Sequence, residues 1–472
     1  MERLVRICDI ELNGFKNVRH GYLSIDAGYA DDKASLLGIY GQNGSGKTSV
    51  IEAMEFVQTL LMGKSLPQNA AEYINAEMGF CEIKIGFCVK ADSCKSRVNY
   101  NVRLEKRDES FIIAGEELSY CKWNGDKYNS KHTVVEHNSD DLMSYKPKYR
   151  CENLIKVNPD NRINIAMAKK ISLKDRNSFI FNEEGRKLFS PRWFAAIEDE
   201  FVREKSIEAT SDYDHIIKSL YDYARLDLFV ITSKHNGPIS MELLMPVAFR
   251  VRHHAGIAKG NLPILLSQPS DIPEEAFEIV ERIIAEINIV LSAVIPGMSL
   301  EVYNHGKPLL KDCMEGYRIQ LLSRRGDVVI PLKYESEGII KIISILNVLM
   351  CVYNNPGMCM MVDELDSGIF EFLLGEILAV FENGAKGQLI FTSHNLRALE
   401  MMAKDHLIFS TTNEDNRYIK LKNVKNSNNV RDLYLRAITL GGQSEEIYAE
   451  TDSVEIGRAL RKAGRMASNG RN

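Results

Sequence analysis

The 472-residue sequence lacks several features that would assign a protein class directly. Its nine cysteines are an odd number and form no C-x-x-C pair, so neither a disulfide framework nor a cysteine-rich zinc site is indicated. No run approaches about 18 uncharged apolar residues, which argues against a membrane-spanning helix. The N-terminus carries charges throughout and has no apolar core of a signal peptide. These absences predict reduced thiols, no membrane partner and a cytoplasmic location.

The sequence also lacks an excess of positive charge. Its formal net charge is -5 and its pI is about 6.1, which argues against a surface built mainly to coat nucleic acid. Two local basic segments remain, and we interpret both mainly as solvated loops or chain ends. Their alternative role is to bind phosphates or an acidic protein. The segments contain Arg250, Arg252, His253, His254 and Lys259, and Arg458, Arg461, Lys462, Arg465 and Arg471.

A glycine-rich segment near the N-terminus is the strongest signal that is present. Residues 41–48 read GQNGSGKT and fit the phosphate-loop pattern G-x-x-x-x-G-K-[ST] in full, after a short apolar run and before a helical pattern. Backbone N–H groups and the helix N-terminus would hold the phosphates. Lys47 would reach the β- and γ-phosphates, and Thr48 would coordinate Mg²⁺. The predicted nucleotide-binding residues here are Gly41, Gln42, Asn43, Gly44, Ser45, Gly46, Lys47, Thr48 and Ser49.

Two further apolar runs end in polar residues that suit nucleotide chemistry. Asp363 and Glu364 follow the run CMMV, at the strand end where open α/β sheets bind ligands. We expect Asp363 to hold Mg²⁺ through water and Glu364 to act as a general base. His394 follows the run QLIF and is predicted to sense the γ-phosphate. Taken alone, such acids are a common strand end and such a histidine is usually structural; the phosphate loop favours the functional interpretation.

A serine–glycine pair supplies a fourth signal. Ser336 and Gly338, within ESEGIIK, open an apolar helical pattern. Such a pair is often only a helix cap. Together with the other three motifs, it predicts an anion-binding helix N-terminus. With the usual winding of the sheet this surface cannot reach the chain's own phosphates, so we expect it to serve a partner subunit.

The order of the motifs predicts the fold class. A phosphate loop near one end and an acidic strand end near the other indicate one α/β P-loop head, with a mixed sheet and an antiparallel β subdomain, that is interrupted by an insertion. Alternating runs within 81–135 indicate an antiparallel meander. Helical periodicity is expected from Lys47 to about Leu61, from Pro273 to about Val294 and from Glu337 to about Tyr353.

Four segments are predicted along the chain. Residues 1–135 would form the N-terminal half of the head with the β subdomain. Residues 136–310 would form a compact, largely helical insertion. Its two helical stretches, from about Ser190 to Asp227 and from Pro273 to about Val294, do not sustain the heptads of a long coiled coil. Residues 311–429 would form the C-terminal half of the head, and residues 430–472 a helical tail.

The four motifs, in this order, resemble the ABC-type ATPase heads of SMC-like repair ATPases, RecF and overcoming-lysogenization-defect (OLD) nucleases. Residues 5–65 and 315–425 carry the resemblance, and GFKN at 14–17 is similar to the opening of that group. It implies ATP and Mg²⁺ as cofactors, hydrolysis of ATP to ADP and phosphate, and ATP sandwiched between two heads. Ser336 and Gly338 of one head would complete the site of the other, and Asp366 would link the two sites.

Two departures from the family pattern matter. The signature reads SEGIIK instead of the transporters' SGGQ, which favours the SMC and OLD branch over a transporter-associated ATPase. The glutamine loop cannot be placed, because Gln58 lies too near the phosphate loop.

The C-terminal segment from Arg431, the length and the segment ISLKDRNSFIFNEEG resemble the ATPase subunits of two-component anti-phage defence systems, in particular PARIS (phage anti-restriction-induced system). The Septu ATPase is a near alternative. The resemblance implies a toxin–antitoxin-like abortive-infection system. Its ATPase would be a homo-oligomer joined through ATP-sandwiched heads, with a hexamer as one arrangement. This assembly would hold a separate effector, such as a Toprim nuclease, and release it when it senses an acidic phage trigger such as a DNA-mimic anti-restriction protein.

No nuclease activity is expected in this chain. A Toprim domain needs a glutamate and a D-x-D pair to hold metal ions. Asp212-x-Asp214 follows no Toprim-like strand and is interpreted as an exposed helix face. The main alternative function is a RecF- or SMC-like repair ATPase that clamps DNA; it needs a basic channel, and the acidic net charge counts against it. Direct DNA binding therefore stays open.

Overall fold

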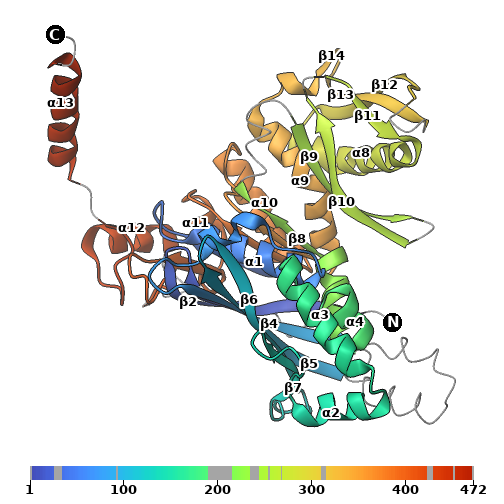
Figure 1. Ribbon diagram of the computed structural model, residues 1–472. Coiled ribbons are helices and arrows are strands. Elements are labelled where there is room, and N and C mark those ends of the chain that lie inside the picture. The colour runs from blue at the N-terminus through green and yellow to red at the C-terminus, as the bar shows by residue number, and fades with distance from the viewer. Residues whose placement is uncertain are drawn as a thin grey trace.

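The architecture is taken from a computed structural model (Figure 1), which contains two six-stranded sheets, a smaller third sheet and a two-stranded hairpin. The structure describes residues 3–25, 34–91, 94–189, 215–233, 244–253, 256–266, 268–309, 315–422, 429–449 and 452–469. The predicted α/β class, with a mixed sheet and an antiparallel β subdomain, is confirmed. The helical content predicted for the insertion is only partly present.

The first large sheet is the antiparallel β subdomain. Its order is β2-β1-β4-β5-β6-β7, and every neighbouring pair is antiparallel. Alternating residues of β1 are buried, as expected for a strand with one face on the core. The meander expected within 81–135 is thus confirmed. The strands are β1 (Leu4–Phe15), β2 (Val18–Ser24), β4 (Phe80–Ala91), β5 (Cys94–Arg107), β6 (Ser110–Lys122) and β7 (His132–Asn138).

The second large sheet is the mixed core sheet, with the order β18-β17-β3-β16-β15-β8. All neighbouring pairs are parallel except β17 and β18. Its central strands are buried along their whole length, which is why they appear in the sequence as continuous apolar runs. The strands are β3 (Ser35–Tyr40), β8 (Leu228–Ile231), β15 (Cys359–Val362), β16 (Gln388–Thr392), β17 (Leu407–Ser410) and β18 (Tyr418–Ile419).

Helices from both halves of the chain cover the core sheet. The predicted helices are present as α1 (Lys47–Leu61), α8 (Glu274–Val294) and α9 (Glu337–Asn354). The buried side chains of α1 join those of the β subdomain in one cluster, whereas those of α9 pack with the core sheet and α10 in another. The remaining helices of the C-terminal half are α10 (Glu371–Gly384), the short α11 (Ala398–Met401) and α12 (Val430–Leu440).

The segment predicted as a largely helical insertion is instead mixed. Its first part contains α2 (Lys148–Val157), α3 (Asn161–Asp175) and α4 (Glu183–Leu188), and residues 215–226 are helical too. Its second part contains strands, and β8 belongs to the core sheet itself. The prediction failed here because LFVI is only four residues long, and periodicity cannot separate so short a buried strand from a helical turn. The Asp212-x-Asp214 pair lies outside the described residues.

Strands β9 to β12 of this second part build a separate layer with α8, and they are joined there by β13 and β14 from the segment predicted as the C-terminal half of the head. The hairpin pairs β9 (Leu244–His253) with β10 (Gly256–Leu265). The third sheet has the order β11-β13-β12, with β14 paired to β13. Its apolar side chains pack with α8 and one side of α9 into a third cluster, at the upper right of Figure 1. The strands are β11 (Ser270–Pro273), β12 (Met298–Gly306), β13 (Gly316–Arg325) and β14 (Val328–Pro331).

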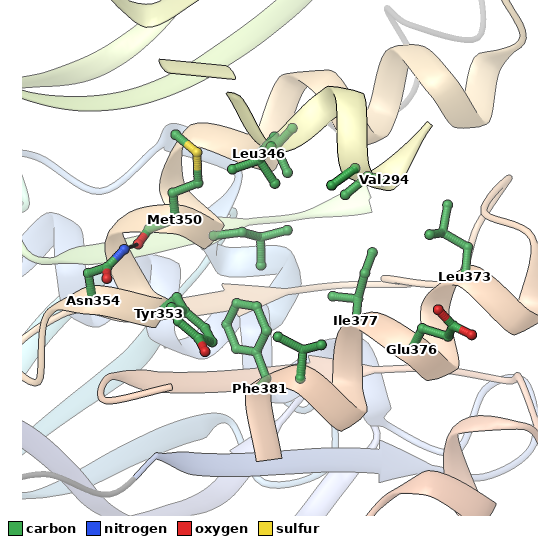
Figure 2. Close-up of a pocket in the computed structure, with 13 residues that line it drawn as sticks. Val294, Leu346, Met350, Tyr353, Asn354, Leu373, Glu376, Ile377 and Phe381 are labelled. Carbon is green, nitrogen blue, oxygen red and sulfur yellow. Dashed lines mark hydrogen bonds between the residues drawn. The ribbon is translucent and has the colours of Figure 1, made fainter. Parts of the chain in front are cut away.

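An apolar groove of about 380 Å³ lies between α8, α9 and α10. Figure 2 shows side chains of α9 and α10 on opposite sides of this groove. Its lining includes Leu346, Tyr353, Ile377 and Phe381, and none of the predicted nucleotide-site residues. Of the described helices, α9 alone is long and apolar enough to cross a membrane, and two thirds of it is buried inside the protein.

The chain ends in α13 (Ser453–Asn469), which extends away from the rest of the molecule (Figure 1). The helices α12 and α13 both lie within the segment predicted as a helical tail. The side chains of Arg458, Arg461, Lys462 and Arg465 are all exposed. This basic segment is solvated, as its main interpretation required.

Candidate nucleotide-binding site

The predicted motifs come together at one edge of the core sheet. Strands β3, β16, β15 and β8 are parallel neighbours, so their carboxyl ends lie at the same edge. The phosphate loop follows β3, Asp363 follows β15, and His394 comes shortly after β16. Ligands of open α/β sheets bind outside this edge. Residues more than 300 positions apart in the sequence thus form one site.

The phosphate loop has a conformation that only glycine allows at its ends. Gly41 has φ 151°, and a Cβ there would lie 1.9 Å from the Ser410 hydroxyl oxygen. Gly46 has φ 87° and precedes α1, whose N-terminus has no side-chain cap. The first N–H groups of a helix carry a partial positive charge. The start of α1 is therefore suited to an anion.

Lys47 is folded over the loop. Its Nζ donates to the carbonyl oxygens of Gly41 and Gln42, each at 2.8 Å, and only 6% of the residue is exposed. Burial lowers the pKa of Lys47 to about 8, while the nearby carboxylates of Asp363, Glu364 and Asp366 oppose that shift. A phosphate would supply the negative charge that a buried ammonium group needs.

Asp363 is the centre of the hydrogen-bonded part of the site. It is 1% exposed, and its Oδ1 accepts hydrogen bonds from Thr48 Oγ1 at 3.1 Å and Thr392 Oγ1 at 2.7 Å. Its Oδ2 is buried and has no hydrogen-bond partner. Buried polar atoms almost always have partners, so this oxygen is available to a ligand. The predicted proximity of Thr48 and Asp363 is observed.

These residues fit a magnesium ion. Mg²⁺ is typically held by one or two carboxylates, substrate phosphates and water, not by a cage of protein ligands. Among the residues that the structure describes, no cluster of three or more His, Cys, Asp or Glu side chains could hold a metal by itself. One carboxylate and one hydroxyl beside a phosphate loop match the magnesium pattern.

Glu364 adopts an unusual backbone conformation beside Asp363. Its φ is 50°, in the left-handed region that residues other than glycine seldom adopt. Its N–H donates to Thr392 Oγ1 at 2.7 Å, and its carbonyl accepts from the N–H of Ser367 at 3.0 Å. Thr392 thus holds both acidic residues through one hydroxyl. The sequence showed Thr392 beside His394, but the hydroxyl's role depends on the register of β15 and β16.

His394 and Asp366 lie together on the exposed side of the site. The backbone N–H of His394 donates to Asp366 Oδ2 at 3.0 Å, and Asp366 Oδ1 is buried without a partner. Partial burial and the Lys47 ammonium lower the pKa of His394. The ring is therefore neutral near pH 7, although the residue as a whole is exposed. A neutral imidazole can donate one hydrogen bond to a phosphate.

The serine–glycine pair at the start of α9 has a structural role within its own chain. Ser336 Oγ accepts from the N–H of Ile339 at 3.4 Å, so Ser336 is the N-cap, and it is exposed. A Cβ on Gly338 would lie 1.8 Å from the carbonyl oxygen of Gly368. Gly338 is therefore required for close packing within its own chain. That Ser336 and Gly338 contact the nucleotide of a second copy stays a prediction.

Three other segments hold the phosphate loop in place. Tyr418 OH donates to the carbonyl of Gly46 at 2.7 Å, and the Asn17 amide donates to the carbonyl of Gly44. From the C-terminal segment, the N–H of Ala449 donates to Gln42 Oε1 at 3.1 Å. The GFKN segment was visible in the sequence, but its contact with the loop was not.

Gln58 is a structural residue. Its Nε2 donates to the carbonyls of Ala224 at 3.0 Å and Leu228 at 2.6 Å, which joins α1 to the start of β8. This agrees with leaving the glutamine loop unassigned to it. The carboxyl end of β8 reaches the same sheet edge as β15, and the buried Thr232 follows it.

The first basic segment does not form a surface patch where the structure describes its side chains. Arg250 pairs with Asp227 at 2.8 Å and donates to the Leu226 carbonyl at 3.1 Å. Lys259 Nζ donates to the carbonyls of Ala224 and Leu228. The side chains of Arg252, His253 and His254 lie outside the described set. The interpretation of this segment as a solvated loop is thus wrong for Arg250 and Lys259, because strand pairing turns both inward.

Comparisons with known proteins give one family match and several similar solved structures. An AAA domain family model matches residues 9–229, which include the phosphate loop. A comparison with curated proteins finds no significant match. Among solved structures, one similar chain is a Smc head domain from Pyrococcus furiosus bound to the C-terminal domain of ScpA, with 12% identity and a TM-score of 0.39 over 88% of this chain and 96% of that chain. The SMC head domain from Thermotoga maritima has 11% identity and a TM-score of 0.36 over 88% of this chain and 99% of that chain. The recombination mediator protein RecF has 11% identity and a TM-score of 0.36 over 88% of this chain and 98% of that chain.

Proposed function

We propose that this chain binds and hydrolyses ATP with Mg²⁺ as an SMC- or RecF-type ATPase. The observation that carries this proposal is the buried Oδ2 of Asp363, which has no partner and lies beside Thr48 of a complete phosphate loop. A buried carboxylate without full compensation is costly. A magnesium ion bound to ATP would compensate it, and the AAA match over residues 9–229 supports the same class.

Each residue has a distinct part in the proposed reaction. Lys47 and the start of α1 bind and orient the phosphates, and Thr48 and Asp363 would hold Mg²⁺, which would supply positive charge beside them. Glu364 accepts a proton from the attacking water. His394 donates a hydrogen bond to the γ-phosphate.

Pairing of two heads is the second part of the proposal. Ser336 is exposed at the start of α9, and Tyr334, two residues earlier, is 67% exposed. Phe370, two residues after the Gly368 that packs on Gly338, is 68% exposed. Exposed aromatic side chains around a polar site are typical of interface cores. A second copy that packs on this face would bring its nucleotide to the start of α9. Asp366, next to the Gly338–Gly368 contact, would then connect the two sites.

For the biological role, we propose the sensor and scaffold subunit of an anti-phage defence system, of the kind represented by the AriA ATPase of PARIS. The resemblance of the C-terminal segment and the 472-residue length support this role. The subunit would hold a separate Toprim-type effector in the cytoplasm and release it when an acidic phage protein binds. The ATPase subunit of a Septu-type defence system is the near alternative to this assignment.

A RecF- or SMC-like DNA clamp is the alternative function. The exposed cations of α13 favour it, because a basic helix that extends from the body can contact phosphates. Binding through these cations would weaken steeply with salt. The sensor and the clamp would use the same ATPase chemistry, but the sensor would bind an effector subunit and the clamp would bind DNA.

The deciding experiment is to purify the tagged chain from its native operon with ATP and Mg²⁺, and to measure the mass and composition of the product. A large symmetric assembly with a second, nuclease-like subunit is the result expected for the sensor. A dimeric ATPase that retains DNA would support the clamp. A chain that neither binds nor hydrolyses ATP would contradict both.

A further inference from the structure

Lys341 is buried beneath the acidic end of β15. It is 3% exposed, and it comes from the second turn of α9. Its Nζ donates to the carbonyl oxygen of Glu364. The carboxylates of Asp366, Glu364 and Asp363 are its main charged neighbours. The lysine is therefore the positive charge that α9 contributes to this cluster.

The bond from Lys341 completes a set of contacts that fixes the Glu364 backbone. The N–H of Glu364 is held by Thr392, and its carbonyl is held by Lys341 and the N–H of Ser367. A left-handed backbone at a residue other than glycine costs on the order of 1–3 kcal/mol and persists only where its surroundings enforce it. Lys341 is the only one of these three partners that is charged, and a charged donor makes the stronger hydrogen bond.

Lys341 also connects two surfaces with different proposed tasks. The exposed start of α9, at Ser336, would meet the nucleotide of a second copy. One and a half turns later the same helix binds the carbonyl of the proposed catalytic glutamate. Gly338, between them, packs on Gly368 in the turn after Glu364. A shift of α9 would therefore move the backbone that carries the Glu364 carboxylate.

We propose that Lys341 is a positioning residue for ATP hydrolysis, which holds the Glu364 backbone so that its carboxylate meets the attacking water. The proposal rests on the proposed ATPase function. Lys341 acts through Glu364 and touches neither water nor nucleotide. Its loss should leave ATP binding intact, because Lys47 and the phosphate loop bind the phosphates, and should slow the chemical step.

Lys169 provides a matched control. It is 2% exposed on α3, and its Nζ donates to the carbonyls of Asp141 and Ser144, beyond the end of β7. Burial lowers the pKa of both Lys169 and Lys341 to about 8. The two lysines thus share burial, ionisation and acceptor type. They differ in whether the acceptor belongs to the catalytic edge.

The test compares Lys341→Met and Lys169→Met with the wild type in ATP affinity, kcat and melting temperature. We expect both variants to melt earlier. We expect Lys341→Met alone to lose kcat, by about 10- to 100-fold, with the Kd for ATP within about threefold, because a small misplacement of a catalytic group has this cost. Lys341→Arg should recover part of the rate. An unchanged kcat in Lys341→Met would overturn the proposal.

A double variant separates positioning from a general effect. In a Glu364→Gln background, Lys341→Met should cause little further loss of kcat, because it acts through the group already removed. An equal loss in both backgrounds would overturn the proposal. If Lys341→Met does not fold, Lys341→Gln replaces it, and a wild-type kcat in that variant would overturn the proposal in the same way. If wild type and Glu364→Gln turn over ATP equally, the proposed ATPase mechanism fails instead.

Discussion

Buried and partly buried lysines lie in two regions of this molecule. Lys47 and Lys341 are buried at the nucleotide edge of the core sheet, whereas the buried Lys169 and the partly buried Lys259 lie in the framework around it. Burial lowers the pKa of the first three to about 8 and that of Lys259 to about 7. All four donate to backbone carbonyls. Burial and a lowered pKa therefore do not distinguish a functional lysine from a structural one.

The surroundings of the lysines make the difference. At the nucleotide edge, three acidic residues gather in a small volume, and two of them keep a buried oxygen without a hydrogen-bond partner. Around Lys259, the neighbour that most favours its charged form is Asp227, which is already paired with Arg250. Asp227 beside Lys259 is thus already paired within the chain. At the nucleotide edge, Asp363 Oδ2 and Asp366 Oδ1 have no hydrogen-bond partner and are available to a ligand. Unpartnered acidic oxygens are therefore a better indication of function than a lowered lysine pKa.

The largest effect expected from this comparison is the loss of nucleotide binding in Lys47→Ala. Lys47 is the only lysine in the phosphate loop, residues 41–48, and its removal would leave the phosphates without a charged side chain from this loop. Lys259→Met, in the framework, should bind ATP like the wild type. Equilibrium binding of a fluorescent ATP analogue measures both. Retained binding in Lys47→Ala would show that the two places do not differ in the proposed way.

A second effect concerns chemistry without binding. Glu364→Gln should bind ATP normally and hydrolyse it at least about 100-fold more slowly, because an amide cannot accept the proton of the attacking water. The backbone contacts of Glu364 do not involve its carboxylate, so the fold should be preserved. Steady-state phosphate release measures kcat. An unaffected kcat would remove Glu364 from the proposed role.

A third effect tests whether a second copy completes the edge. Ser336→Arg places a bulky cation at the exposed start of α9 and should leave ATP binding by the monomer intact. It should block ATP-driven pairing of heads, so that the mass measured by light scattering with ATP and Mg²⁺ stays that of the monomer. Lys333→Ala, three residues earlier in the chain, is the control that should still pair. Pairing by Ser336→Arg would contradict the shared site.

The fold class and the segments that meet at the sheet edge could both be predicted from the sequence. Local sequence patterns indicate the proposed roles of the phosphate loop, Asp363, Glu364 and His394. All of them follow parallel strands whose carboxyl ends lie at one edge of the sheet. Thr392 and Lys341 were missed because their roles depend on strand register and helix packing. The inward orientation of Lys259 was missed for the same reason. Short buried strands such as β8 carry too few residues for their periodicity to identify them.

The smallest effect is a pH dependence of stability that belongs to the framework. Lys259 has a pKa of about 7 in the folded protein, against an ordinary value of 10.5, because burial penalises its charged form. Between these values the unfolded chain binds more protons than the folded chain at this residue. The contribution of Lys259 to the free energy of unfolding therefore rises with pH, by at most about 1.4 kcal/mol per pH unit.

Urea unfolding of the wild type and Lys259→Met at pH 7, 8 and 9 tests this directly. Groups remote from Lys259 titrate equally in both proteins, so the difference between their unfolding free energies reports on Lys259 and its neighbour Asp227. We expect the wild type to gain on the variant at each step, while ATP affinity at any one pH is the same in both. A difference that is constant with pH would mean that Lys259 keeps its charge when folded. The Asp227 carboxylate would then compensate the Lys259 charge within the chain, in contrast to the unpartnered carboxylate oxygens at the nucleotide edge.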